Sequence, residues 1–407
     1  MRIGIDYTSA VRQGAGIGRY TRNLVQALLA LDAENDYVLL AATGGLDRAP
    51  SCPDGAESGS REAVAAAQAN VGTPSPQRWR DFASRADGIR AVNLPVSDRF
   101  LAILWHRLRL PLWAELFCGR LSVFHSPDFT LPPVRRARTV LTVHDLSFIR
   151  VPESSAPRLR SYLLQAVPRS ASRADVILAD SQCTRADVIE LLHVDPGRVK
   201  VLYPGVEERF QRVQDEQALA LVRRRYSLPE RFVLSVGTLQ PRKNYERLIG
   251  AFSLLRQEEG TEAKLVIAGG LGWMYEGISR RVAELGLSDA VCFLGYAADQ
   301  DLPALYSLAN LFAFPSLYEG FGLPPLEAMA CSTPVVTSNV SSLPEVVGDA
   351  ALMVDPLDVP ALAEAMSRGL NDDTLRPGMV SRGLARARQF RWSDSAAHLL
   401  EIYRRLG

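Results

Sequence analysis

The sequence predicts an α/β fold made of two doubly wound parallel sheets in series. Short apolar runs alternate with segments of helical periodicity along most of the 407 residues. The runs are almost continuously hydrophobic, as strands covered by helices on both faces must be. Helical connections imply right-handed crossovers, and the chain is too long for one ordinary core. We therefore expect two Rossmann-like domains that face a central cleft.

The strand pattern occurs once in each half of the chain. In the first half the predicted strands are "RIGID", "YVLLAA", "LSVFHS", "TVLTVHD", "DVILADS" and "VKVLYPG". In the second half they are "FVLSVG", "KLVIAGG", "VCFLG", "LFAFPS", "PVVTSN" and "ALMVD". We place the first domain at 1–203 and the second at 204–385, and we expect a C-terminal helix in 386–407 to pack across their junction. Residues 43–98 are rich in Gly, Ser, Ala, Pro and charge, which predicts a long, mobile insertion in the first domain.

Composition excludes several classes of protein. With 47% hydrophobic and 22% charged residues and a net charge of +1, the chain has the make-up of a soluble globular protein and no bias toward nucleic acid. Five scattered cysteines without a C-x-x-C pair argue against disulfides and zinc, so we expect a cytoplasmic location. The N-terminus has no apolar core of a signal peptide. The apolar stretch "RFLAILWHRLRLPLWAELF" is interrupted by Arg, His and Pro, which favours a core-facing helix over a membrane span or a membrane-surface helix.

The stretch "FPSLYEGFGLPPLEAMACSTPVV" carries the main chemical signal. It reads as a strand, a glycine loop and a helix with prolines in its first turn. Ligands of open parallel sheets bind at the C-terminal strand ends, and amides near Gly322 and Leu323 would bind an anion such as phosphate. Glu319 lies in the loop and Glu327 about one turn into the helix, and carboxylates suit the paired hydroxyls of sugars and riboses. The segment therefore fits a nucleotide sugar, and the alternative is a capping acid and a solvated helix acid.

The stretch "SVGTLQPRKNYERL" predicts the cations of the same site. It again reads as strand, glycine turn and helix, with Arg242 and Lys243 before the helix. Two cations at an anion-binding helix end would stabilise a leaving diphosphate. The alternative is a solvated surface pair.

Three further patterns are weaker. "GAGIGRY" follows the first strand, but Arg19 occupies the last glycine position of a dinucleotide fingerprint. "VLTVHD" places His144 at a strand end facing the cleft, whereas His125 at another strand end is expected to be structural. Asp299 and Asp301 match a metal-binding D-x-D, yet they precede a helix whose N-terminus acids stabilise, so we expect no metal.

Six segments together resemble the retaining glycosyltransferases that use the GT-B fold and carry an E-x7-E motif (glycosyltransferase family 4, "glycosyl transferases group 1"). They are "GIGRY", "TVHDLSF", "YPGV", "VGTLQPRKN", "FPSLYEGFGLPPLEAMA" and "PEVVGDAALMVDP". The resemblance covers nearly the whole chain outside 43–98. It implies a GT-B fold, a nucleotide-sugar donor as substrate, and no cofactor.

The resemblance also implies roles for the donor-side residues. In that family the first motif glutamate, here Glu319, lies at the donor sugar, and the second, Glu327, binds the nucleotide ribose. The basic pair at the diphosphate corresponds to Arg242 and Lys243. Many relatives place an arginine directly after the glycine of "VG", where this chain has Thr238. The remaining predicted donor contacts are Gly16, Gly237, Gly320, Phe321, Gly322 and Leu323.

On the other side of the cleft, His144 corresponds to a histidine that lines the site where the acceptor meets the anomeric carbon. We expect Asp145 to orient it, and we expect Gly14 and Arg19 on the acceptor side. The catalytic set implied by the resemblance is His144, Asp145, Arg242, Lys243 and Glu319.

The resemblance implies front-face retention without a metal ion, in which the departing diphosphate deprotonates the acceptor. "GIGRY", "FHSPDFTLPP" and "TVHDLSFIRVPE" are most similar to bacterial mannosyltransferases that use GDP-mannose to build O-antigen or other polysaccharide. UDP-glucose and UDP-GlcNAc users share the same skeleton. More distant alternatives are a GT-B epimerase or phosphorylase, a non-catalytic sugar-nucleotide-binding subunit, and an NAD-dependent oxidoreductase.

The acceptor is expected to be a glycan or a lipid-diphosphate-linked saccharide. Residues 99–173 contain 12 arginines against 4 acidic residues. That excess predicts peripheral contact with the anionic inner face of the cell membrane.

Overall fold

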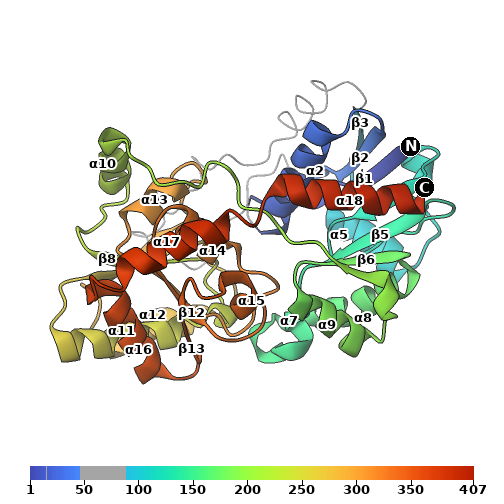
Figure 1. Ribbon diagram of the computed structural model, residues 1–407. Helices are drawn as coiled ribbons and strands as arrows, with labels where there is room; N and C mark the ends of the chain where they lie inside the picture. The colour runs from blue at the N-terminus through green and yellow to red at the C-terminus, as the bar shows by residue number, and fades with distance from the viewer. Residues whose placement is uncertain (15, 46–88) are drawn as a thin grey trace.

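The computed structural model describes residues 1–14, 16–45 and 89–407 and contains two separate parallel sheets (Figure 1). The first has seven strands in the order β3-β2-β1-β4-β5-β6-β7. Their bounds are β1 Arg2–Asp6, β2 Asp36–Ala42, β3 Ile89–Leu94, β4 Val123–Ser126, β5 Arg138–Val143, β6 Val176–Ala179 and β7 Val199–Val201. We call this sheet and the helices on it the first lobe.

The second sheet has six strands in the order β10-β9-β8-β11-β12-β13. Their bounds are β8 Phe232–Val236, β9 Lys264–Ala268, β10 Val291–Gly295, β11 Leu311–Phe314, β12 Val335–Ser338 and β13 Leu352–Val354. With its helices it forms the second lobe. In both sheets the order reverses beside the first strand of the sheet, which is where an open α/β sheet binds ligands.

Helices cover both faces of each sheet. In the first lobe they are α1 Thr8–Arg12, α2 Ile17–Leu31, α5 Asp98–Ala102, the π-helix η1 Ile103–Arg107, α6 Glu115–Cys118, α7 Ser147–Arg150, the 3-10 helix η2 Pro152–Ser154, α8 Pro157–Arg173, α9 Gln182–Leu192 and the 3-10 helix η3 Pro196–Arg198. In the second lobe they are α10 Glu216–Arg225, the 3-10 helix η4 Pro241–Lys243, α11 Tyr245–Glu259, α12 Glu276–Glu284, α13 Leu302–Leu308, α14 Leu323–Ala330, α15 Leu343–Val347, α16 Val359–Asn371 and α17 Arg376–Ala387.

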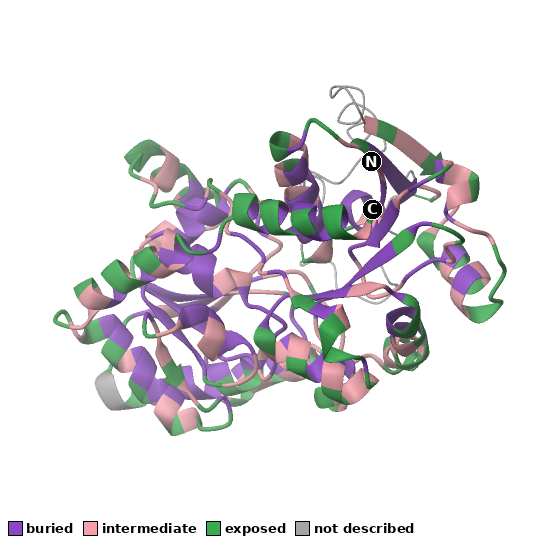
Figure 2. Ribbon diagram, turned by 45° about the vertical axis from the view of Figure 1, so that its right-hand side comes forward, coloured by how far each residue is buried: buried purple, intermediate pink, exposed green. Residues whose placement is uncertain are grey.

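Each sheet separates two hydrophobic cores, which explains why its strands are apolar at nearly every position. On β11, Phe312 and Phe314 pack into one core while Leu311 and Ala313 pack into the other. Figure 2 shows the strands of both lobes mostly buried and the outer faces of the helices exposed. The predicted parallel α/β architecture is therefore confirmed.

The chain passes between the lobes at two places that lie side by side. The amide of Val206 donates to the carbonyl of Phe390 at 2.9 Å, and the hydroxyl of Ser395 donates to the carbonyl of Tyr203 at 2.6 Å. The first residues of α18 (Trp392–Leu406) follow this crossing, and α18 packs against α2 of the first lobe while α17 packs against α14 of the second (Figure 1). The proposed domain limits at 203 and 385 stay predictions.

The predicted insertion at 43–98 is wrong at its C-terminal end. Residues Ile89–Leu94 form β3, which pairs in parallel with β2 at the sheet edge, and α5 begins at Asp98. The strand was missed because "IRAVNL" is a partly exposed edge strand that contains Arg90 and Asn93 and is not the continuous apolar run expected of a covered strand. Residues 46–88 of the predicted insertion lie outside the described part of the chain. None of the described helices combines the length and the apolar character needed to cross a membrane.

Candidate active site between the two lobes

The two sequence stretches with cations and glutamates meet at the C-terminal ends of β8 and β11. Arg242 Nη1 donates to Glu319 Oε2 at 2.7 Å, and Lys243 Nζ donates to Glu319 Oε1 at 2.6 Å. All three side chains are largely buried. Burial alone would raise the pKa of Glu319, but the charges of Arg242 and Lys243 outweigh it and lower that pKa to about 2. Glu319 is therefore a carboxylate at neutral pH.

Local backbone geometry fixes this arrangement. Gly322 has a φ of +114°, which favours glycine, and Leu323 then begins α14 with prolines in its first turn. Gly237 directly follows β8 and lies so close to Lys243 that an added Cβ would be 3.2 Å from Lys243 Cε. Thr238 follows it and lies against Gly272. Both loops thus bring backbone close to the ion cluster.

The stability of this cluster can be tested by a double-mutant cycle. Glu319→Gln leaves Arg242 and Lys243 without their carboxylate, and we expect it to lower the free energy of unfolding by about 3 to 5 kcal/mol. Adding Lys243→Met should recover part of that loss, because it removes one uncompensated buried cation. Urea unfolding of the four proteins checks this. Equal effects of Lys243→Met in both backgrounds would contradict the coupling.

The second glutamate is held by the other lobe. Glu327 on α14 accepts a hydrogen bond from Tyr306 at 3.0 Å and forms an ion pair with Arg19 of α2. Arg19 Nε also donates to Glu207 at 2.6 Å, and its guanidinium lies 5.1 Å from the ring centre of Phe210. The predicted acceptor-side Arg19 therefore contacts the carboxylate predicted to bind ribose.

This contact predicts a change in shape when Arg19 is altered. Arg19→Gln removes the cation that joins α2 to α14, and we expect a larger mean radius of gyration by small-angle X-ray scattering. Arg404→Gln is the control, because its ion pair with Glu34 lies within the first lobe. An unchanged radius for Arg19→Gln would show that the pair does not hold the lobes together.

His144 lies opposite the donor loop but its partner is not the one expected. Its Nδ1 contacts Asp180 Oδ2 at 2.8 Å and its Nε2 contacts the carbonyl of Pro127 at 3.1 Å. The prediction that Asp145 orients the ring is wrong, because Asp145 Oδ1 accepts from the amide of Ser147. The Asp180 of "DVILADS" also ends a parallel strand, and the strand-end rule applied to His144 would have found it.

The loop carrying Gly320 lies against the first lobe. A Cβ on Gly320 would stand 1.9 Å from the carbonyl oxygen of His144, and Thr184 Oγ1 donates to both the His144 and the Gly320 carbonyls at 3.3 and 3.1 Å. Tyr318 donates to Asp187 across the same boundary. The lobes are thus in direct contact at this loop.

The other predicted residues have varied surroundings. Gly16 directly precedes α2 with a φ of +58°, and a Cβ on Gly14 would lie 3.4 Å from Tyr296 Oη of the second lobe. Phe321 is buried and its ring lies 6.1 Å from that of Tyr203 and 5.4 Å from that of Phe390, beside the lobe crossing. These contacts assign Phe321 a packing role.

Two residues considered for other chemistry, His125 and Asp301, have protein partners. The ring of His125 contacts Tyr403 at 2.7 Å and Thr142 at 2.9 Å, and burial lowers its pKa to about 3. Asp301 accepts from Arg225 at 2.6 Å and from Tyr226. Across residues 1–14, 16–45 and 89–407, no group of three His, Cys, Asp or Glu side chains could hold a metal ion.

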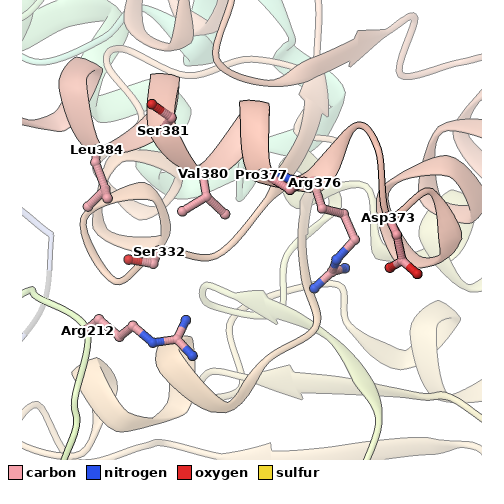
Figure 3. Close-up of a pocket in the computed structure, with 8 residues that line it drawn as sticks. All are labelled: Arg212, Ser332, Asp373, Arg376, Pro377, Val380, Ser381 and Leu384. Carbon is pink, nitrogen blue, oxygen red and sulfur yellow. The ribbon is translucent and has the colours of Figure 1, made fainter.

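An open hollow of about 560 Å³ lies elsewhere, along α17. Its lining residues are Arg212, Ser332, Asp373, Arg376, Pro377, Val380, Ser381 and Leu384. Figure 3 shows the Arg212 and Arg376 side chains turned toward it. None of the predicted site residues lines this hollow.

Comparison with known proteins identifies the family. The family model "Glycosyltransferase Family 4" matches residues 14–210, and "Glycosyl transferases group 1" matches residues 223–385. The "O-antigen chain mannosyltransferase B" of Escherichia coli is 36% identical over 285 residues, which cover 70% of this chain and 74% of that protein. The chain belongs to glycosyltransferase family 4.

Solved structures agree on the fold of this glycosyltransferase. The sucrose-phosphate synthase of Thermosynechococcus elongatus aligns with a TM-score of 0.72 at 23% identity, covering 100% of this chain and 99% of that one. HepE from Anabaena in complex with UDP and glucose aligns with a TM-score of 0.66 at 17% identity, covering 98% of each chain. The chain therefore has the GT-B fold, and it is a glycosyltransferase of a retaining family.

Proposed function

We propose that this glycosyltransferase transfers mannose from GDP-mannose, with retention and without a metal ion, to a glycan or lipid-linked saccharide in polysaccharide synthesis. The observation that carries the proposal is the buried cluster in which Glu319 lies between Arg242 and Lys243 at the end of the second sheet. It supplies cations for a diphosphate beside a carboxylate for a sugar. The likeness to O-antigen mannosyltransferase B supports the choice of donor.

In the proposed complex the donor lies between the lobes. The diphosphate binds Arg242, Lys243 and the backbone at the start of α14, the sugar binds Glu319, and the ribose binds Glu327 in place of Arg19. Phosphate at a helix N-terminus is stabilised by its free amides and by the helix dipole. Tyr306 continues to hold the second oxygen of Glu327.

The proposed reaction takes place on one face of the sugar. The bond from the anomeric carbon to the diphosphate oxygen breaks as the bond to the acceptor oxygen forms, and the acceptor proton passes to the departing diphosphate. Arg242 and Lys243 stabilise the negative charge that grows on that diphosphate, which is the largest contribution expected of this site.

A donor panel tests the proposed substrate. Thermal shift with GDP-mannose, UDP-glucose and UDP-GlcNAc, followed by detection of released GDP or UDP, should single out GDP-mannose. Release of UDP instead would reassign the donor within the family. Reduction of NAD without nucleotide release would support the oxidoreductase alternative.

Exposed side chains of the first lobe support the proposal that the protein contacts an anionic membrane at its cytoplasmic face. Within the arginine-rich stretch several large apolar side chains are exposed, namely Phe100, Ile103, Leu108, Leu110, Leu116, Leu159 and Leu164. The predicted core-facing helix at 99–117 is broken into α5, a π-helix and α6, which leaves its exposed apolar side chains outside the core, while Leu159 and Leu164 lie on α8. Apolar insertion and attraction to anionic lipid would act together. Co-sedimentation with anionic vesicles at low salt should detect binding, and equal binding to neutral vesicles would contradict the electrostatic part.

A further inference from the structure

The His144 ring has no free nitrogen. It is buried between the rings of Tyr20 and Phe129, at centroid distances of 4.7 and 5.6 Å. Nδ1 contacts the Asp180 carboxylate at 2.8 Å and Nε2 contacts the Pro127 carbonyl at 3.1 Å. Both contacts are within hydrogen-bond distance, so each nitrogen is committed to the protein.

The partners determine the protons on the ring. A carbonyl oxygen can only accept, so Nε2 must carry a proton. With Asp180 ionised, Nδ1 must carry one too, and the ring is then an imidazolium. Burial alone would lower the pKa of His144, but the charge and the hydrogen bond of Asp180, with a smaller contribution from Asp128, raise it to about 9.

The surrounding charges favour the cation. Asp180 and Asp128 act on the ring directly and raise its pKa, whereas burial and the charge of Asp145 raise the pKa of Asp180 itself. His125 is the nearby group that would oppose a positive ring, and its own pKa is lowered to about 3 by burial, so it is neutral at physiological pH. The negative charges of Asp180 and Asp128 therefore outweigh the influences that would keep the His144 ring neutral.

The backbone of His144 lies against the proposed donor loop. The backbone carbonyl of His144 is the atom against which Gly320 packs, and Gly320 directly follows Glu319. The Thr184 hydroxyl ties the same carbonyl to Gly320. Any movement of His144 would therefore be transmitted to the donor loop.

We propose that Asp180 is a positioning residue that keeps the His144 ring doubly protonated and fixed, so that the ring acts as a stationary cation beside the donor loop and not as a base. This rests on the proposed function, in which the donor sugar binds at Glu319, next to the Gly320 backbone that packs on His144. A ring without a free lone pair cannot take the acceptor proton. The assignment therefore agrees with a reaction in which the departing diphosphate takes it.

Nuclear magnetic resonance tests the protonation without any donor. The chain has five histidines, so labelling with nitrogen-15 histidine gives few signals, and His144→Gln assigns the one of interest. Both ring nitrogens of His144 should show the chemical shifts of an imidazolium at pH 7.5 in the wild type. In Asp180→Asn they should show the shifts of a neutral imidazole. A neutral ring in the wild type would overturn the proposal.

The pH profile of transfer tests the functional part. If turnover needs the charged ring, the wild-type rate should fall as pH rises through about 9. In Asp180→Asn this fall should move about one to three pH units lower. Asp128→Asn is the matched control, because Asp128 has a smaller effect on the ring, and it should move the fall much less.

The outcomes separate this proposal from the proposed function. If the fall in rate at alkaline pH occurs at the same pH in Asp180→Asn as in the wild type, and the melting temperature is normal, the positioning role is overturned even if GDP-mannose is the donor. A neutralised ring in that variant supports the assignment of the protons even if the donor proves to be a different nucleotide sugar.

Discussion

Gly320→Ala should reduce the rate of sugar transfer at least about 100-fold while the protein stays folded. An added Cβ would lie 1.9 Å from the His144 carbonyl oxygen and 2.9 Å from Asp145 Cβ, so the two lobes could not approach as they do here. The backbone of Gly320 is outside the left-handed region, so alanine causes no local strain. Because misplacement by about 1 Å can reduce a rate 100-fold, we expect a loss of at least about that size.

Nucleotide release measures the rate of transfer in this variant, and circular dichroism measures whether it is folded. Gly270→Ala, after β9 of the same sheet, is a matched control, since its added Cβ meets nothing within 4 Å. It should turn over normally. Wild-type turnover in Gly320→Ala would show that the lobe contact at this loop is not part of the working enzyme.

Lys243→Ala should lose transfer activity by about 100- to 1000-fold, the usual effect of removing a group that stabilises charge in the transition state. The fold should survive, because Arg242 still pairs with Glu319 in this variant. Lys243→Met keeps most of the volume that packs 4.5 Å from the centre of the Phe314 ring, and it should lose activity to a similar extent.

The chain offers a direct control for Lys243, since only Lys200 and Lys264 are lysines besides it. Lys200 is exposed on β7 of the first lobe, and Lys200→Ala should be silent. Steady-state rates with the donor chosen by the panel measure all three variants. If Lys243→Ala turns over like Lys200→Ala, the diphosphate is not held by this cation.

Local patterns were enough to predict the architecture and one half of the site. Strand, glycine loop and proline-started helix follow from short stretches, so Glu319 and its helix could be placed from the sequence alone. Arg242 and Lys243 follow another strand end in the same sheet, and parallel strands bring such ends together. Their meeting with Glu319 is therefore a consequence of topology.

Contacts between the lobes could not be predicted in this way. Arg19 and Glu327 are 308 positions apart on helices of different lobes, so no periodicity relates them. The sequence predicts that Asp145, the next residue, orients His144. Successive residues after a strand point in different directions, however, and the ring contacts Asp180 at the end of the adjacent strand. The edge strand β3 was missed because it is partly exposed, and Arg90 and Asn93 interrupt its apolar residues.

A crystal structure with the bound donor tests the central claim most directly. With the nucleotide sugar that gives the largest thermal shift, we predict diphosphate oxygens on Arg242 and Lys243, the sugar at Glu319, and the ribose on Glu327 with Arg19 displaced. Donor bound instead in the hollow along α17, or bound anywhere with the Arg19–Glu327 pair intact and Glu319 free of sugar, would contradict the account.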